Sequence, residues 1–140
     1  MGIIKKIIDG SNGHKLKRTV LVIEEQVQNQ NFIRRALRKK YQISMTANRE
    51  VAYAIANQEK PDLIVLSRNG KKTIDLCAKL KSEERTQNIP ILIIAEDGSN
   101  IVEYYFKRVE GYLIKPFSES RLLYHVEELI KSDKVFDTKY

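Results

Sequence analysis

The chain has 140 residues, of which 42% are hydrophobic and 31% charged, and its formal net charge at pH 7 is +7. This length suits one globular domain, and the apolar runs are too short to form a membrane-spanning helix. The single cysteine, Cys77, excludes an internal disulfide and a zinc site made of several cysteines. We therefore expect a cytoplasmic, reducing location.

The positive charge is concentrated near the N-terminus. Residues 1–18 carry five basic side chains and one acidic side chain, whereas residues 19–131 carry 18 basic and 15 acidic side chains. We accordingly expect a basic leader over residues 1–18, a globular domain over 19–131 and a C-terminal tail over 132–140. Because the globular part is only mildly basic, nucleic-acid binding by the domain itself is not expected.

Strand-like segments recur along the chain from Thr19 onward. The runs 20–23, 63–66 and 91–94 are apolar throughout, which is typical of central strands with both faces buried. Residues 42–47 alternate between apolar and polar side chains, and residues 112–114 form a short run, so both segments are expected to be edge strands.

The segments between these strands have helical periodicity. An apolar stripe over residues 32–37 predicts the first helix, and Asn48 is expected to cap a second helix that turns Val51, Ala54 and Ile55 inward. Two more helices are expected over roughly residues 73–84 and 100–108, and Ser118 should cap an amphipathic last helix. Strands that alternate with helices imply a parallel sheet with right-handed crossovers, here in the order 2-1-3-4-5.

Polar side chains follow the predicted strands. In an open parallel sheet, ligands bind beyond the carboxyl ends of the strands, so these side chains should converge on one edge. The residues expected there are Glu24, Glu25, Ser67, Ala95, Glu96, Asp97 and Lys115. Beyond Ser67, we expect Arg68, Lys71 and Lys72 to form a basic, solvated loop, with a contact to an acidic partner as the alternative.

Four stretches, residues 20–25, 61–66, 89–94 and 111–117, carry a resemblance to a known family. From Thr19 to about Lys131 the chain resembles a response-regulator receiver domain with the CheY-like, or flavodoxin-like, fold. The sequence Lys115-Pro116-Phe117 before an amphipathic helix is a specific marker of this family. The resemblance implies a three-layer α/β sandwich with five strands and five helices, a role in two-component signal transduction, and a protein partner. It also implies a cis peptide bond between Lys115 and Pro116.

The chain departs from the family's phosphorylation site. Glu24 and Glu25 stand where the family has aspartates that hold Mg²⁺. Ser67 stands at the phosphoacceptor aspartate, Ala95 replaces a threonine or serine, and Lys115 is kept. A serine cannot form the acyl phosphate, and Mg²⁺ tolerates little displacement of its carboxylate ligands. The resemblance therefore implies a degenerate pseudo-receiver without enzymatic activity, metal or cofactor. Because Lys115 shares one edge of the sheet with the carboxylates and has no phosphate to meet, we expect it to form an ion pair with Glu24 or Glu25.

Aromatic residues indicate a contact surface. Tyr104, Tyr105 and Phe106 are consecutive, and three successive helical positions span about 200° of a helix, so they cannot all face one core. The resemblance implies that the fourth helix, fifth strand and fifth helix form the output and dimer surface. We expect an interaction face that includes Tyr104, Tyr105, Tyr112 and Phe117, for a protein partner or a homodimer. For Tyr112, simple packing is the alternative.

The sequence thus favours a phosphorylation-independent pseudo-receiver that acts through protein–protein interaction. One alternative is an atypical switchable receiver that binds a metal or small ligand at Glu24, Glu25 and Asp97, or is modified at Ser67. Another alternative is a basic adaptor whose leader contacts nucleic acid or a membrane.

Overall fold

The computed structural model describes the backbone of residues 17–139 and the side chains of residues 17–131. Along the chain the elements are β1 (Arg18–Ile23), α2 (Val27–Leu37), β2 (Tyr41–Thr46), α3 (Arg49–Glu59), β3 (Leu63–Ser67), α4 (Gly70–Ser82), β4 (Ile91–Ala95), α5 (Ile101–Phe106), β5 (Gly111–Ile114) and α6 (Glu119–Lys139). Residues 1–16 of the expected leader lie outside the described residues. Helix α6 includes residues 132–139, which were expected to form a tail.

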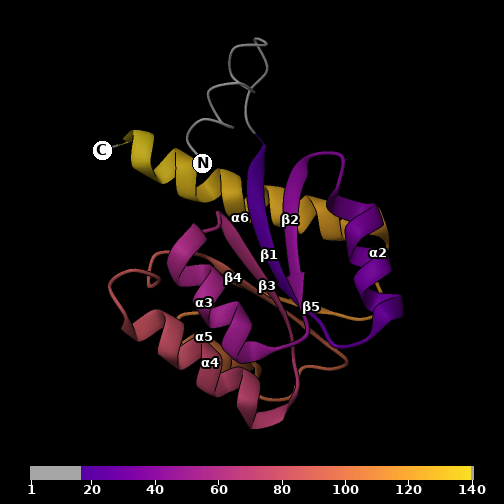
Figure 1. Cartoon of the computed structure of the whole chain (residues 1–140), viewed down its shortest axis with the longest axis horizontal. Coiled ribbons are helices and arrows are strands. Elements are labelled where there is room, and N and C mark those ends of the chain that lie inside the picture. The colour runs from indigo at the N-terminus through magenta and orange to yellow at the C-terminus, as the bar shows by residue number, and fades with distance from the viewer. Residues whose placement is uncertain (1–16, 140) are drawn as a thin grey trace.

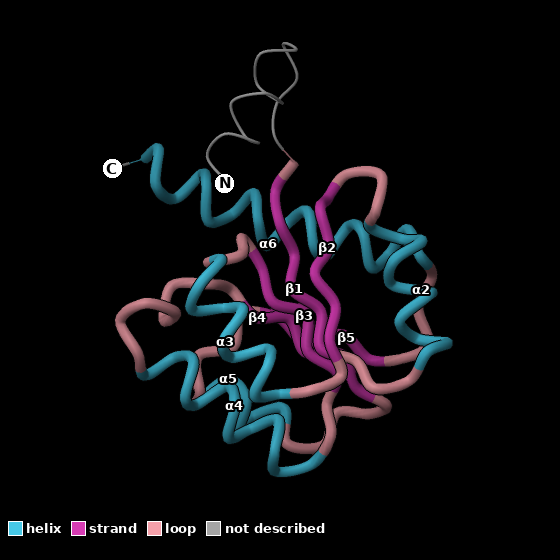
Figure 2. The backbone as a smooth tube through the Cα atoms, in the orientation of Figure 1, coloured by secondary structure: helices cyan, strands magenta, loops and turns pink. Residues whose placement is uncertain are grey.

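The five strands form one parallel sheet in the order β2-β1-β3-β4-β5, which confirms the predicted order. Figures 1 and 2 show the sheet between two helical layers, with α2 and α6 on one face and α3, α4 and α5 on the other. The three-layer sandwich with five strands and five helices is therefore confirmed for the described part of the chain. No helix within residues 17–139 is both long and apolar enough to cross a lipid bilayer.

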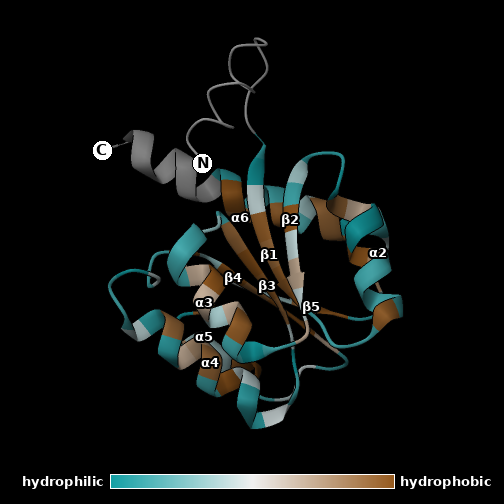
Figure 3. Cartoon of the chain, viewed as in Figure 1, coloured by the Kyte–Doolittle hydropathy of each residue, from teal (hydrophilic) through white to brown (hydrophobic). Residues whose placement is uncertain are grey.

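The central strands are apolar on both faces because each face lies under a helical layer (Figure 3). In β1, Leu21 and Ile23 pack toward α3, α4 and α5, whereas Val20 and Val22 pack toward α2 and α6. Strands β3 and β4 divide their side chains between the two layers in the same way. Strand β2 lies at the edge and is only partly buried beyond Tyr41, which explains its alternating sequence.

Both predicted helix caps are present. The Asn48 side chain accepts a hydrogen bond from the Val51 backbone N–H at 2.9 Å, at the start of α3. The Ser118 hydroxyl accepts one from the Arg121 backbone N–H at 3.1 Å, at the start of α6. Each cap satisfies a backbone donor that has no partner within its own helix.

The predicted inward face of α3 is wrong for two of its three residues. Ala52 and Ala56 are buried, whereas Val51 and Ala54 are exposed; Ile55 packs against the core as expected. The two buried alanines lie one helical turn apart on the face that meets the sheet. Their small side chains let α3 lie close to the sheet, and this turns the larger Val51 toward solvent.

We expect the Cys77 thiol to be unreactive in the folded chain. Cys77 lies on α4 and is fully buried, and burial raises the pKa of its thiol to about 12. Only the thiolate is nucleophilic, so an aromatic disulfide reagent at mildly alkaline pH should modify Cys77 only after unfolding. The measurement is the rate of thiolate release with and without concentrated guanidinium chloride. Equal rates in the two conditions would contradict the expectation.

We also expect the Tyr104 hydroxyl to contribute nothing to stability. Tyr104 is fully buried on α5, and its hydroxyl forms no hydrogen bond of ordinary geometry among the described residues. Burial is the main reason that its pKa is raised to about 12, although the Thr73 side chain lies close enough to the hydroxyl to lower the pKa slightly. Tyr104→Phe should leave the free energy of unfolding unchanged or raise it by up to about 1 kcal/mol. Tyr104→Ala should lower it by about 3–5 kcal/mol, because the ring fills the core.

Urea denaturation of the Tyr104 variants measures both effects. Tyr105→Phe is the matched control, because Tyr105 lies on the same helix with its ring exposed, and it should be neutral. A loss of more than about 1.5 kcal/mol in Tyr104→Phe would mean that the buried hydroxyl forms a favourable hydrogen bond.

Candidate functional site

A cavity of about 270 Å³ lies at the carboxyl ends of β1, β3, β4 and β5. The sequence predicted seven residues at this edge, and six of them line the cavity: Glu24, Glu25, Ser67, Ala95, Glu96 and Lys115. The seventh, Asp97, does not line it. The charged side chains of the wall are three carboxylates and three cations, namely Glu24, Glu25, Glu96, Arg49, Arg68 and Lys115. The cavity wall therefore has no excess of either sign.

Glu24 is the most enclosed of the carboxylates, with 4% of its surface exposed. One carboxylate oxygen accepts a hydrogen bond from the Gln26 backbone N–H at 2.9 Å. The other oxygen accepts the hydrogen bond that the Ser67 hydroxyl donates. This contact joins the ends of β1 and β3, and it occupies the hydroxyl at the position where the resemblance places the phosphoacceptor.

Glu25 contacts residues at the starts of α3 and α4. Its carboxylate accepts a hydrogen bond from the Asn69 side-chain amide at 2.9 Å and lies 3.5 Å from the Arg49 guanidinium. The Nε atom of Arg49 is buried and has no hydrogen-bond partner among the described residues. The two consecutive glutamates thus serve different neighbours and do not converge on one point.

Lys115 forms an ion pair with Glu96, at 3.2 Å, so the expected pairing with Glu24 or Glu25 is wrong. Glu24 is already engaged by Ser67, and Glu25 is turned toward Arg49. Glu96 directly follows β4, the neighbour of β5, and is the carboxylate that the Lys115 side chain meets. The peptide bond between Lys115 and Pro116 is cis, as the resemblance implied.

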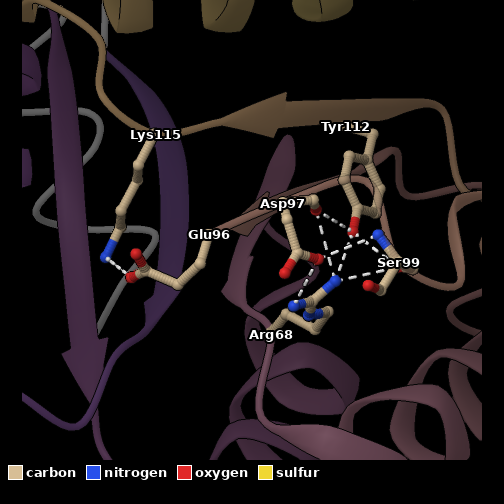
Figure 4. A network of polar contacts seen from close by, with 6 residues as sticks. All are labelled: Arg68, Glu96, Asp97, Ser99, Tyr112 and Lys115. Atoms are coloured by element: carbon tan, nitrogen blue, oxygen red, sulfur yellow. Dashed lines mark hydrogen bonds and ion pairs between the residues drawn. The ribbon is translucent and has the colours of Figure 1, made fainter.

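Arg68 has a larger role than the sequence indicated. Instead of lying in a solvated loop, its guanidinium is mostly covered and contacts the loop between β4 and α5 (Figure 4). It pairs with the Asp97 carboxylate at 3.0 Å and donates hydrogen bonds to the Ser99 carbonyl at 2.8 Å and the Tyr112 hydroxyl at 2.9 Å. The sequence signal that could have indicated this network is an arginine after β3, an aspartate after β4 and a tyrosine within the neighbouring β5.

Three of the four residues of the expected interaction face are buried or partly buried. Tyr104 is fully buried, so it cannot contact a partner, and Tyr112 packs against it with ring centroids 5.7 Å apart. Phe117 is partly buried and packs edge-on against Phe32 of α2 at 5.8 Å. Of the predicted face, Tyr105 is the exposed large side chain.

Helix α5 exposes an apolar outer surface that the sequence prediction missed in part. Val102 and Phe106 lie on the side of the helix opposite the buried Tyr104, Tyr105 lies at its flank, and Phe106 has 81% of its surface exposed. Ile114 of β5 is also exposed. We call Val102, Tyr105, Phe106 and Ile114 the α5–β5 patch. Within the described residues, no group of three or more His, Cys, Asp or Glu side chains is arranged to hold a metal ion.

Comparison with known proteins assigns the family. The model of the response regulator receiver domain matches residues 20–127. The chain is 26% identical over 132 residues to histidine kinase P4 of Formosa agariphila, a match that covers 90% of this chain and 10% of that protein. It is 28% identical over 119 residues to the phosphate regulon transcriptional regulatory protein PhoB of Pseudomonas aeruginosa, which covers 81% of this chain and 52% of that protein. The chain thus spans between a tenth and about half of the length of these relatives.

A solved structure has the same fold. A response regulator from Thermotoga maritima superposes with a TM-score of 0.75 at 22% sequence identity, over 83% of this chain and 99% of that chain. The family match covers most of the chain, and the sheet order and helical layers agree with it. The chain therefore belongs to the response regulator receiver domain family.

Proposed function

We propose that this receiver domain acts in two-component signalling as a protein-binding module that works without phosphorylation and without catalysis. The observation that carries the proposal is Ser67, at the carboxyl end of β3, with its hydroxyl hydrogen-bonded to Glu24. A serine has no carboxylate to form an acyl phosphate, and this hydroxyl already has an acceptor. A nucleophile of the family's kind is therefore missing from the place where the resemblance expects it.

The charges around the cavity support the same proposal. Lys115 is paired with Glu96, and Arg68 is paired with Asp97, so each cation has a carboxylate from the same loop. Phosphoryl transfer depends on positioned positive charge that stabilises the transferred group. Cations that are already neutralised by neighbouring side chains provide little of this stabilisation.

The α5–β5 patch supports binding to a protein. Exposed apolar side chains that share one face mark interaction sites more often than scattered ones do, and aromatic residues contribute much of the energy of such contacts. In α5 three of the four exposed positions hold a valine, a tyrosine and a phenylalanine, and the fourth is Glu103, whereas an ordinary surface helix carries mostly polar residues there. We propose that the patch contacts a signalling protein, with a second copy of the chain as the alternative partner.

An NMR titration tests phosphorylation independence. Amide spectra of the labelled chain should stay unchanged when Mg²⁺ and then beryllofluoride, a mimic of the phosphoryl group, are added. A receiver domain with an intact aspartate site serves as the positive control under the same conditions. Shifts around Glu24, Ser67 and Lys115 that reach Tyr112 would contradict the proposal and favour the switchable alternative.

Site-specific photo-crosslinking in cells tests the α5–β5 patch. A photoreactive phenylalanine analogue at Phe106 should give a discrete cross-linked product, whose mass distinguishes a protein partner from a second copy. Val102→Ser should reduce the product, because it removes apolar area next to Phe106 without disturbing the core. Val51→Ser is the matched control, since Val51 is an exposed valine on α3. Loss of product in both variants, or no product from Phe106, would count against the patch.

A further inference from the structure

Arg68 is anchored at the centre of the sheet edge. It directly follows β3, and its backbone N–H donates a hydrogen bond to the Ile94 carbonyl of β4 at 2.8 Å. Its side chain is 17% exposed and extends past the end of β4 to residues 96–100, which connect β4 to α5. A guanidinium in this position is mostly shielded from water and must be satisfied by protein groups.

The β4–α5 loop supplies those groups. One guanidinium nitrogen lies 3.0 Å from the Asp97 carboxylate. The other donates to the Ser99 carbonyl at 2.8 Å, to the Tyr112 hydroxyl at 2.9 Å and, at 3.3 Å, to the Asp97 carbonyl. Figure 4 shows these contacts converging on the loop from the Arg68 side chain. The planar guanidinium thus binds several loop groups at once, which a lysine could not do.

Tyr112 holds the same loop from the other side. Its hydroxyl lies 2.9 Å from both the Asp97 and the Ser99 carbonyl oxygens and donates its one hydrogen between them. Its ring packs against the buried Tyr104 of α5. The loop is therefore held by residues that follow β3 and lie on β5, with β4 between them.

The loop conformation needs such support. The Asp97 carboxylate accepts a hydrogen bond from the Ser99 backbone N–H at 2.9 Å. Asn100, immediately before α5, has a φ of +63°, in the left-handed region that L-residues other than glycine adopt at a cost of about 1 kcal/mol. Since α5 has only six residues, the direction of this helix relative to the sheet depends on the loop that precedes it.

We propose that Arg68 is a positioning residue that holds the β4–α5 loop and the Tyr112 side chain in one arrangement, and so fixes the direction in which α5 presents its apolar outer surface. The connection between Arg68 and the α5–β5 patch rests on the proposed function. The role of Arg68 in holding the β4–α5 loop does not depend on the proposed function.

The acidity of Asp97 is consistent with a permanent contact. Hydrogen bonds from Ser99, and then the Arg68 guanidinium, lower the pKa of the Asp97 carboxyl to about 2. A lowered pKa means that the contribution of this ionised group is present above the ordinary aspartate pKa and is lost only as the pH falls through about 2. Near neutral pH the Arg68–Asp97 pair is therefore always charged on both sides.

Amide hydrogen exchange on the full-length chain tests the proposal. In Arg68→Gln, amides within residues 96–106 should exchange about tenfold faster, as expected when a hydrogen bond worth about 1.4 kcal/mol is lost. Arg85→Gln is the matched control, because Arg85 also donates to a backbone carbonyl, that of Asn57, at 3.1 Å. It should leave exchange in residues 96–106 unchanged. Equal exchange in the two variants would overturn the proposal.

Three further variants separate positioning from general loss of stability. Tyr112→Phe keeps the ring but removes the hydroxyl, so it should speed exchange in the loop by a smaller factor. The double variant with Arg68→Gln should exchange no faster than Arg68→Gln alone, because Arg68 holds the Tyr112 hydroxyl in place and Tyr112 loses its grip on the loop once Arg68 is gone. Arg68→Lys should restore the protection only in part. Full additivity of the two single variants, or full protection in Arg68→Lys, would contradict the proposed geometry.

The cross-linking experiment distinguishes this proposal from the proposed function. If Arg68→Gln loosens the loop and weakens the Phe106 cross-link, both the positioning role and its link to the α5–β5 patch are supported. If the loop loosens but the cross-link is unchanged, the link to the patch is overturned. If exchange in the loop is unchanged, the positioning role is overturned, whatever the cross-link shows.

Discussion

Charge neutralisation at the carboxyl edge of the sheet determines the structure around the site. All strands of a parallel sheet end at this edge, so the charged residues that follow them meet there. Each of the three cations takes one carboxylate, in the pairs Arg49–Glu25, Arg68–Asp97 and Lys115–Glu96. A partly buried charge without a partner is unfavourable, because it loses hydration and no ion pair or hydrogen bond offsets that loss. The pairs link segments that follow different strands: Arg49–Glu25 joins the start of α3 to the segment after β1, and Arg68–Asp97 and Lys115–Glu96 join the segments after β3 and β5 to the loop after β4.

The sequence was sufficient for features that depend on local pattern. Continuous apolar runs identified the central strands, because strands covered on both faces have no polar side. Alternation placed β2 at the edge, and Asn48 and Ser118 marked where two helices begin. Six of the seven residues predicted for the edge line one cavity for the same reason, since the strand order fixes which ends are neighbours.

The partners of side chains at that edge could not be predicted in the same way. The sequence placed three glutamates near Lys115 at this edge and could not say which of them it pairs with. Lys115 pairs with Glu96, whereas Glu24 accepts hydrogen bonds from Ser67 and Gln26. From the sequence, Arg68 resembled the other basic residues near it. No neighbouring residue in the sequence indicates that its side chain extends past the end of β4 to the loop before α5. The face of α5 was equally hard to assign, since a six-residue helix is too short to give a reliable apolar period.

The contact between Ser67 and Glu24 limits which side chains position 67 tolerates. A single Ser67→Asp change would place a second carboxylate against the enclosed Glu24, and like-charge repulsion would replace a hydrogen bond. A carboxylate at position 67 would then need a cation beside it to be held close to Glu24. The hydroxyl of Ser67 needs no such cation, because it donates a hydrogen to Glu24.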